Sequence, residues 1–256
     1  MLSELIAGAV ADASARRAVR SQADVERAAL DRAPALDALA ALAPADRVKI
    51  IAEVKRASPS RGALADIPDP AALAARYETG GASAISVLTE GRRFGGSLED
   101  LEAVRARVSL PVLRKDFIVL PYQVFEARAA GADLVLLMAS ALEQADLVEL
   151  YALVTELGMT ALVEAHDAEE VARAVDLGAS VIGINARNLS TFELDPGIFP
   201  RLVDRLPSGT IRVAESAVKT AADVARYREA GADVVLVGEA LVTGDPVATL
   251  TEFLAG

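Results

Sequence analysis

The sequence contains no cysteine, no tryptophan and a single histidine, His166. Without cysteine the chain can form neither disulfide bonds nor thiolate metal sites, and it has no cysteine nucleophile. A single histidine leaves one candidate base for a serine–histidine pair, and it excludes a metal site built from several histidines. These absences fit a protein of a reducing compartment.

Long apolar runs and an excess of basic residues are missing as well. No apolar stretch reaches the ~18 residues that a membrane span needs. The start, MLSELIAGAV, places Glu4 before a short apolar run, whereas a secretion signal has the opposite order. The net charge of −11 argues against a nucleic-acid or anionic-membrane partner, although a local pocket can still bind phosphate. We therefore expect a cytoplasmic protein with no nucleic-acid or membrane partner.

Four similar segments recur along the chain, each with a Gly-Ala pair, a small polar residue and an apolar run. They read GGASAISVL, AGADLVLLM, LGASVIGIN and AGADVVLVG. The pairs begin at Gly81, Gly131, Gly178 and Gly231, which by subtraction are 50, 47 and 53 residues apart. The glycine is typical of a residue that ends a helix with positive φ. The apolar run is typical of a strand buried on both faces, as in a parallel sheet.

Four further segments, which lie between the repeats, have the composition of strands. They cover residues 49–55, 111–117, 160–165 and 210–216. Together with the repeats they give eight strands, one every ~25 residues, with helical patterns between them. This alternation favours a single (β/α)8 TIM barrel over an open doubly wound sheet.

The domain organisation follows from the position of the first strand. The 256 residues are 53% hydrophobic, which is enough for a large core, and neither a linker nor a second domain is evident. Residues 1–46 are rich in alanine and arginine and are predicted to form a helical extension packed on the barrel. Residues 47–256 are predicted to form the barrel.

Short polar motifs mark the expected starts of helices. Asp69-Pro70 and Asp195-Pro196 are typical of an N-cap followed by proline at the first helical position. Ser97-Leu-Glu-Asp100 and Asp167-Ala-Glu-Glu170 have the pattern of a capping box.

Charged and polar side chains follow the expected strands, at the end of the barrel where TIM-barrel active sites lie. Ionised groups there are expensive unless they are paired or functional. They are Glu53, Lys55, Lys115, Glu164, Asn185, Arg187, Glu215, Ser216 and Glu239.

Each of these residues also has a plainer interpretation. Glu53 and Lys55 point the same way and can form a structural ion pair. Arg114 and Asp116 belong either to a solvated loop or to pairing beside the site. His166 follows Glu164 by two residues and has either a chemical role or none. Phe94 and Phe117 either line a pocket or simply pack.

Three loops are candidates for phosphate binding. The segment KRASPSRG, residues 55–62, follows the first strand, and ESAV and VGEAL follow the seventh and eighth strands. In this fold the last two loops often bind phosphate through backbone N–H groups and a helix N-terminus.

Six segments, in this order and at these spacings, resemble the indole-3-glycerol phosphate synthase family. They are IIAEVKRASPSRG, VLTEGRRFGGS, PVLRKDFI, LVEAHD, IGINARNL and RVAES, and the resemblance runs from about Val48 to the C-terminus. It implies a single (β/α)8 barrel that needs no metal or organic cofactor. It also implies a phosphosugar substrate, 1-(2-carboxyphenylamino)-1-deoxyribulose 5-phosphate, which is converted into indole-3-glycerol phosphate, carbon dioxide and water in tryptophan biosynthesis. We expect the protein to be a monomer.

The resemblance also assigns residues. Lys115 matches the family's general acid and Glu164 its general base, while Lys55 lies near the substrate carboxylate and Glu53 positions the lysines; the division of acid roles between Lys55 and Lys115 stays open. A mouth with several cations is expected to lower the pKa of a lysine toward the working pH. Substrate-binding positions are Asn185, Arg187, Glu215, Ser216, Phe94, Phe117 and Leu189. Phosphate-binding positions are Ser58, Ala217, Gly238 and Glu239.

One position departs from the family pattern. The family usually reads ESG after the seventh strand, and this chain reads ESA, with Ala217 in place of the glycine. If that position needs a positive φ, alanine costs on the order of 1 kcal/mol there.

Two other classes of function compete with this interpretation. One is a different phosphosugar barrel enzyme, such as a Schiff-base aldolase with Lys115 as nucleophile. The other is a non-catalytic barrel that binds a phosphosugar, although such a protein would be expected to lose the charged strand ends.

Overall fold

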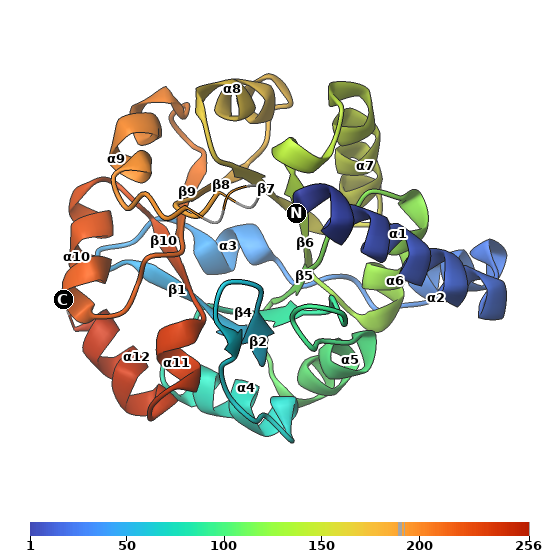
Figure 1. Cartoon of the computed structure of the whole chain (residues 1–256), viewed down its shortest axis with the longest axis horizontal. Coiled ribbons are helices and arrows are strands. Elements are labelled where there is room, and N and C mark those ends of the chain that lie inside the picture. The colour runs from blue at the N-terminus through green and yellow to red at the C-terminus, as the bar shows by residue number, and fades with distance from the viewer. Residues whose placement is uncertain (189–190, 192, 256) are drawn as a thin grey trace.

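The computed structural model describes residues 1–188, 191 and 193–255, and its centre is a closed barrel of parallel strands (Figure 1). Around the barrel the strand order is β1-β10-β9-β8-β7-β6-β5-β4. This confirms the predicted (β/α)8 barrel and excludes the open sheet. In the described ranges the barrel strands are β1 (Lys49–Val54), β4 (Ala84–Leu88), β5 (Val112–Lys115), β6 (Leu134–Met138), β7 (Thr160–Ala165), β8 (Val181–Asn185), β9 (Ile211–Glu215) and β10 (Val234–Val237).

Helices follow the strands and cover the outside of the barrel (Figure 1). They are α4 (Pro70–Thr79), α5 (Leu98–Arg107), α6 (Pro121–Ala130), α7 (Gln144–Glu156), α8 (Ala168–Asp176), α9 (Ile198–Leu202), α10 (Ala221–Glu229), α11 (Glu239–Val242) and α12 (Pro246–Leu254). Short 3₁₀ turns, η1 (Ala139–Ala141) and η2 (Val203–Arg205), and a hairpin of β2 (Ala57–Ser58) and β3 (Gly62–Ala63) complete the connections. None of the helices in the described ranges combines the length and apolar character that a membrane crossing needs.

The repeated glycines have the conformation that the sequence predicts. Gly81, Gly131, Gly178 and Gly231 have φ values of 93°, 96°, 72° and 95°. A positive φ is easy for glycine and costly for residues with a side chain, so each glycine lets a helix end and the chain turn into the next strand.

The predicted helix starts are confirmed at three of the four positions. Asp69 accepts a hydrogen bond from the backbone of Ala72, at 2.9 Å, ahead of α4. Ser97 and Asp167 cap α5 and α8 in the same way. The reciprocal half of the capping box is absent at both, because the third-position carboxylates bond elsewhere: Asp100 pairs with Arg56, and Glu170 accepts from His166.

The prediction at Asp195 is wrong. Helix α9 begins at Ile198, and its N-cap is Gly197. The backbone N–H of Asp195 donates to the carbonyl of Ala186, at 2.8 Å, so the chain is still held beside the end of β8 at that point. The Asp195 carboxylate accepts from the Gly197 N–H, at 3.0 Å, and stabilises a turn before the helix.

The first 46 residues form helices that pack on the barrel, as predicted: α1 (Leu2–Val19), α2 (Gln22–Leu30) and α3 (Ala38–Leu42). Helix α3 precedes β1 and closes the amino end of the barrel, where Leu42 joins the interior cluster; Figure 1 shows it through the ring of strands. Helix α1 reaches the other end, where Leu2 and Leu5 join the same cluster as Phe94 and Phe117.

Side chains alternate between the inside and the outside of the barrel, because successive residues of a strand point to opposite faces. Ile51, Leu113 and Leu162 pack in the interior cluster, whereas their neighbours Ile50, Val112 and Val163 pack against the helices. Continuing by two residues from the interior positions leads to Glu53, Lys115 and Glu164. The alternation therefore directs these charges into the barrel at its carboxyl end.

Candidate active site

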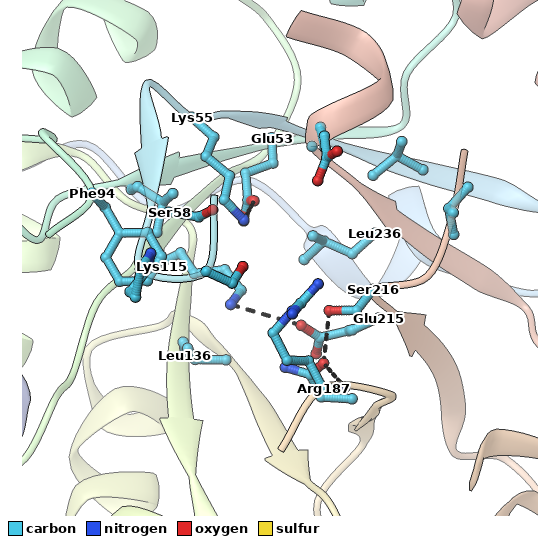
Figure 2. Close-up of a pocket in the computed structure, with 18 of the residues that line it drawn as sticks. Glu53, Lys55, Ser58, Phe94, Lys115, Leu136, Arg187, Glu215, Ser216 and Leu236 are labelled. Atoms are coloured by element: carbon cyan, nitrogen blue, oxygen red, sulfur yellow. Dashed lines mark hydrogen bonds and ion pairs between the residues drawn. The ribbon is translucent and has the colours of Figure 1, made fainter. Parts of the chain in front are cut away.

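A large pocket opens at the carboxyl end of the barrel, with about 1090 Å³ of empty space including its open mouth (Figure 2). This is enough for a substrate with an aromatic ring and a sugar phosphate. Every predicted site residue lines it except Glu164, which lies beneath the lining, and Leu189, which lies outside the described residues. The lining includes Glu53, Lys55, Ser58, Phe94, Lys115, Phe117, Asn185, Arg187, Glu215, Ser216, Ala217, Gly238 and Glu239.

The ionisable groups come from alternate strands. Lys115 ends β5 and Glu215 ends β9, while Glu53 and Glu164 lie one residue before the ends of β1 and β7. The strands between them carry neutral residues opposite these groups: Leu88 on β4, Met138 on β6 and Asn185 on β8, with Gly238 directly after β10. Each charged strand therefore has neutral strands on both sides.

Glu53 and Lys55 form an ion pair on the side of the pocket near β1, with 3.2 Å between Oε1 and Nζ. The predicted ion pair between Glu53 and Lys55 is thus confirmed. Both still line the pocket, and Figure 2 shows their polar ends side by side. Gly238 makes room for the pair, since a Cβ there would lie 2.6 Å from Oε1 of Glu53.

Lys115 lies at the floor of the pocket among carboxylates. Its Nζ is 3.5 Å from Oε2 of Glu164 and 3.8 Å from Oε2 of Glu215. Burial lowers the pKa of Lys115, but the negative charges of Glu164, Glu215 and Glu53 outweigh it, so the pKa is raised. The expectation of a lowered lysine pKa is therefore wrong, because acids rather than cations surround Lys115. The side chain is an ammonium with 15% of its surface exposed to the pocket.

Glu164 is fully buried behind this lysine. Its oxygens are held at ion-pair distances, with Lys115 at 3.5 Å and Nε2 of His166 at 3.4 Å. Burial raises the pKa of Glu164, but Lys115 and His166 together lower it below its ordinary value. Glu164 is thus a buried carboxylate whose ionised form is favoured by Lys115 and by the neighbouring His166.

Glu215 behaves in the opposite way. Burial and the neighbouring charge of Glu164 raise its pKa well above the ordinary value, and Lys115 only partly offsets this. Close carboxylates that share one lysine cannot both ionise easily, so Glu215 keeps its proton to higher pH than Glu164 does. Gly183 on β8 leaves space for this side chain, since a Cβ there would lie 2.2 Å from Oε1 of Glu215.

Polar groups at the ends of β8 and β9 are linked through Asn185. Its Oδ1 accepts from the Ser216 hydroxyl, at 2.8 Å, and from the backbone N–H of Arg187, at 2.9 Å. These bonds fix the backbone from which Arg187 extends, and Figure 2 shows its side chain in the pocket beside Glu215 and Ser216.

An aromatic wall closes the side toward α1. The rings of Phe94 and Phe117 are 6.3 Å apart and tilted by 45°, and Nζ of Lys55 lies 5.8 Å from the centre of the Phe94 ring. Buried Glu90 shapes this wall, because its carboxylate accepts the backbone N–H groups of Phe94 and Arg93 at 2.9 and 2.7 Å. Both phenylalanines thus pack on the extension and also line the pocket.

The opposite side of the pocket is built from backbone turns. Ser216 and Ala217 both have positive φ, at 69° and 56°, so the position where the family carries glycine does need the left-handed conformation. Gly238 is the N-cap of α11, and the side chain of Glu239 pairs with Arg61 at 3.1 Å. Ser58, in the β2–β3 hairpin, also lines the pocket, and Figure 2 shows it near Lys55 and Phe94.

Arg114 and Asp116 flank Lys115 but are buried, so the loop interpretation of these residues is wrong. Arg114 donates to Asp116, Thr89 and the carbonyl of Gln123, at 3.0, 3.1 and 2.7 Å. The pairing interpretation is confirmed: the two residues form a network outside the barrel that anchors the strand carrying Lys115.

Several pocket residues were missed by sequence reasoning. The apolar floor could have been found by extending the alternation of two along each strand; it consists of Leu88, Leu136, Met138 and Leu236. Glu90 carried no signal of its own, because its role depends on the shape of its loop. Lys219 also lines the mouth, and its position just after the predicted phosphate loop was the only available signal.

Comparisons with known proteins agree with this geometry. Residues 2–254 match the family model described as indole-3-glycerol phosphate synthase. A protein of that name from Leifsonia xyli is 72% identical over 253 residues, covering 99% of this chain and 97% of the relative. One from Beutenbergia cavernae is 57% identical over 256 residues, covering 100% and 95%. Among solved structures, 3-hexulose-6-phosphate synthase from Salmonella typhimurium aligns with TM-score 0.66 at 16% identity, over 81% of this chain and 97% of that one, which shows a shared fold alone.

Proposed function

The chain belongs to the indole-3-glycerol phosphate synthase family, and we propose that Lys115 and Glu164 are the general acid and general base of its reaction. The activity is that of a carbon–carbon lyase of tryptophan biosynthesis. The observation that carries the residue assignment is the Lys115–Glu164 pair, 3.5 Å apart, at the floor of the large pocket at the barrel's carboxyl end.

Ring closure requires a proton donor. As the ring carbon that bears the carboxylate attacks the ribulose carbonyl, negative charge develops on the carbonyl oxygen. Lys115 is an ammonium that protrudes from the floor of the pocket, so it can donate a proton there and stabilise the developing charge. The raised pKa of Lys115 supports this role, because it keeps the proton on the lysine until the oxygen becomes strongly basic.

The later steps return electrons to the ring and expel water. Loss of carbon dioxide leaves its bonding electrons in the ring, and dehydration then removes a proton from carbon while a hydroxyl leaves as water. Glu164 is ionised and takes that proton after its carboxylate turns from beneath the lining into the pocket. Lys55, tied to Glu53 at 3.2 Å, is the second cation able to protonate the leaving hydroxyl.

The remaining lining residues support binding of the two ends of the substrate. The Phe94–Phe117 wall suits the aromatic ring, and Arg187 suits the carboxylate, because a guanidinium binds a carboxylate through two parallel hydrogen bonds. The Ser58, Ala217, Gly238 and Glu239 side suits the phosphate through a hydroxyl and backbone N–H groups. Leu189, which lies outside the described residues, is a candidate for binding the aromatic ring by resemblance alone.

Further parts of the proposal concern the whole protein. We infer that it acts as a monomer in the cytoplasm, since its pocket is formed within one chain and the sequence lacks cysteine. We also infer that residues 1–46 and 47–256 form a single domain, because the helical extension contributes Leu2 and Leu5 to the barrel's interior cluster.

The test is the appearance of indole fluorescence when the protein is mixed with the carboxyphenylamino-deoxyribulose phosphate in EDTA. The chain contains no tryptophan, so the product signal stands above a weak background. We expect the wild type to give the signal and Lys115→Ala to lose about 10²–10⁴-fold in kcat. Equal rates from both folded proteins would overturn the assignment of the acid. Loss of the wild-type signal in EDTA would overturn the expectation that no metal is needed.

A further inference from the structure

His166 lies one residue beyond β7, beside the proposed base but outside the pocket lining. Its side chain is 7% exposed, and its Nε2 is 3.4 Å from Oε1 of Glu164. Because the imidazole does not border the space that the substrate occupies, any effect on the reaction has to pass through Glu164.

The imidazole is oriented by a second carboxylate. Oε2 of Glu170, in the first turn of α8, accepts the backbone N–H of His166 at 2.7 Å and contacts ring Nδ1 at 3.1 Å. One carboxylate therefore holds both the backbone and the ring. In a capping box, the carboxylate of Glu170 would accept the backbone N–H of the cap residue, Asp167. Here it accepts from His166 instead.

This arrangement determines the protonation of the ring. If His166 were neutral with its proton on Nδ1 for Glu170, Nε2 would present a lone pair to an oxygen of Glu164. If the proton were on Nε2, a lone pair would face Glu170 instead. Only an imidazolium, with N–H groups on both sides, matches the two carboxylates.

The charges around the ring favour the same state. Burial lowers the pKa of His166, but the hydrogen bond with Glu170 and the charges of Glu164 and Glu170 outweigh it and raise the pKa. Lys115, which pairs with the other oxygen of Glu164, opposes them, and Glu215 lies next to both Lys115 and Glu164. Two negative groups thus act on His166 at close range and one positive group at longer range.

We propose that His166 is a positioning residue for the base: clamped by Glu170, it binds Oε1 of Glu164 as an imidazolium and leaves Oε2 to Lys115 and the substrate. The proposal rests on the proposed role of Glu164. It gives the buried carboxylate one cation on each side, so that the base stays charged when Lys115 gives up its proton. The same contact fixes which oxygen of Glu164 is able to face the pocket.

The first test uses the fact that the chain has one histidine, so its ring nitrogens need no assignment. At pH 6.5, where an ordinary histidine is about half protonated, nitrogen NMR of the ¹⁵N-labelled wild type should show a predominantly doubly protonated ring. In Glu164→Gln the midpoint of the titration should fall by about one pH unit or more. A wild-type ring that is half protonated or less at pH 6.5 would overturn the proposal.

The second test is the pH profile of kcat. In His166→Gln the acidic limb should move up by about one pH unit, with KM within about twofold of wild type. Glu170→Gln should move it less in the same direction, since the amide oxygen can still accept the Nδ1 proton. Exposed Glu169→Gln, on the same turn, is the matched control and should leave the profile unchanged.

The failures can be distinguished. Wild-type kcat in Glu164→Gln would reject Glu164 as the base, and with it the ground for this inference. A loss of about 10²–10⁴-fold in Glu164→Gln, with an unmoved limb in folded His166→Gln, would reject the role of His166 alone. If His166→Gln does not fold, the NMR titration of the wild type still decides.

Discussion

At the scale of single residues, the turn after β9 carries a conformational cost. Ser216 and Ala217 are the non-glycine residues with positive φ among the described residues, and they are adjacent. Such strain persists where the surroundings enforce it and tends to gather at functional sites. Here the Ser216 hydroxyl is held by Asn185, and its carbonyl accepts from Tyr227 at 3.3 Å.

Replacing Ala217 with glycine should relieve part of this strain. We expect Ala217→Gly to raise the free energy of unfolding by about 1 kcal/mol, offset in part by the greater freedom of glycine in the unfolded chain. For a chain of this length the midpoint of thermal unfolding should rise by roughly 2–4 °C. Ala221→Gly, at the start of α10, is the control and should lower the midpoint, because that residue is helical. A lower midpoint for Ala217→Gly would contradict the argument.

The positions of the charged residues could be predicted from the sequence, but their contacts could not. Alternation by two along each strand places Glu53, Lys115 and Glu164 inside the barrel, and the strand count places them at one end. The contacts of buried Glu164 include Lys115 from β5, which no pattern local to β7 contains. The pKa directions depend on the same long-range packing, so the expected direction for Lys115 was wrong.

At the scale of elements, the repeats made most of the barrel predictable. Each Gly-Ala pair marks the end of one helix and the approach to a buried strand, which is a local signal. The failure at Asp195 has a non-local cause, because the backbone there is held by Ala186 at the end of β8. The docking of α1 and α3 on opposite ends of the barrel could not be predicted either, since their apolar residues do not specify what they pack against.

Helix α3 offers a test of its role as a plug for the amino end of the barrel. Leu42 is 0% exposed and joins the interior cluster, whereas Leu39 on the same helix is 40% exposed. We expect Leu42→Ala to lower the free energy of unfolding by about 2–5 kcal/mol, measured by urea denaturation. Leu39→Ala should change it by no more than about 0.5 kcal/mol. Similar effects of the two variants would show that α3 does not seal the interior.

At the scale of the whole molecule, the buried acids at the mouth should make stability depend on pH. The pKa of Glu215 is raised in the folded state, so its contribution is present below the unfolded value and is lost as pH rises toward the folded value. The pKa of Glu164 is lowered, so its contribution is present above the unfolded value and is lost as pH falls.

Replacing Glu215 with glutamine should remove the part of the stability that is lost as pH rises. Above about pH 4.3, the unfolded value of a glutamate, the free energy of unfolding of Glu215→Gln should decline less with pH than that of the wild type. Urea denaturation at several values between pH 5 and pH 8 measures the difference. Exposed Glu252→Gln is the control and should follow the wild type. Parallel curves for Glu215→Gln and the wild type would contradict a proton held on Glu215.

The alternation of charged and neutral strands around the barrel also divides the labour of the enzyme. In the proposed mechanism the proton-transferring groups belong to β1, β5, β7 and β9 or directly follow them, while Leu88, Met138, Asn185 and Gly238, on or directly after the intervening strands, line the space between them. Substitutions on the neutral strands could therefore change the shape of the cavity while the proposed proton-transferring residues stay the same. The residues of the charged strands would then determine reactivity, and those of the neutral strands would determine which substrates fit.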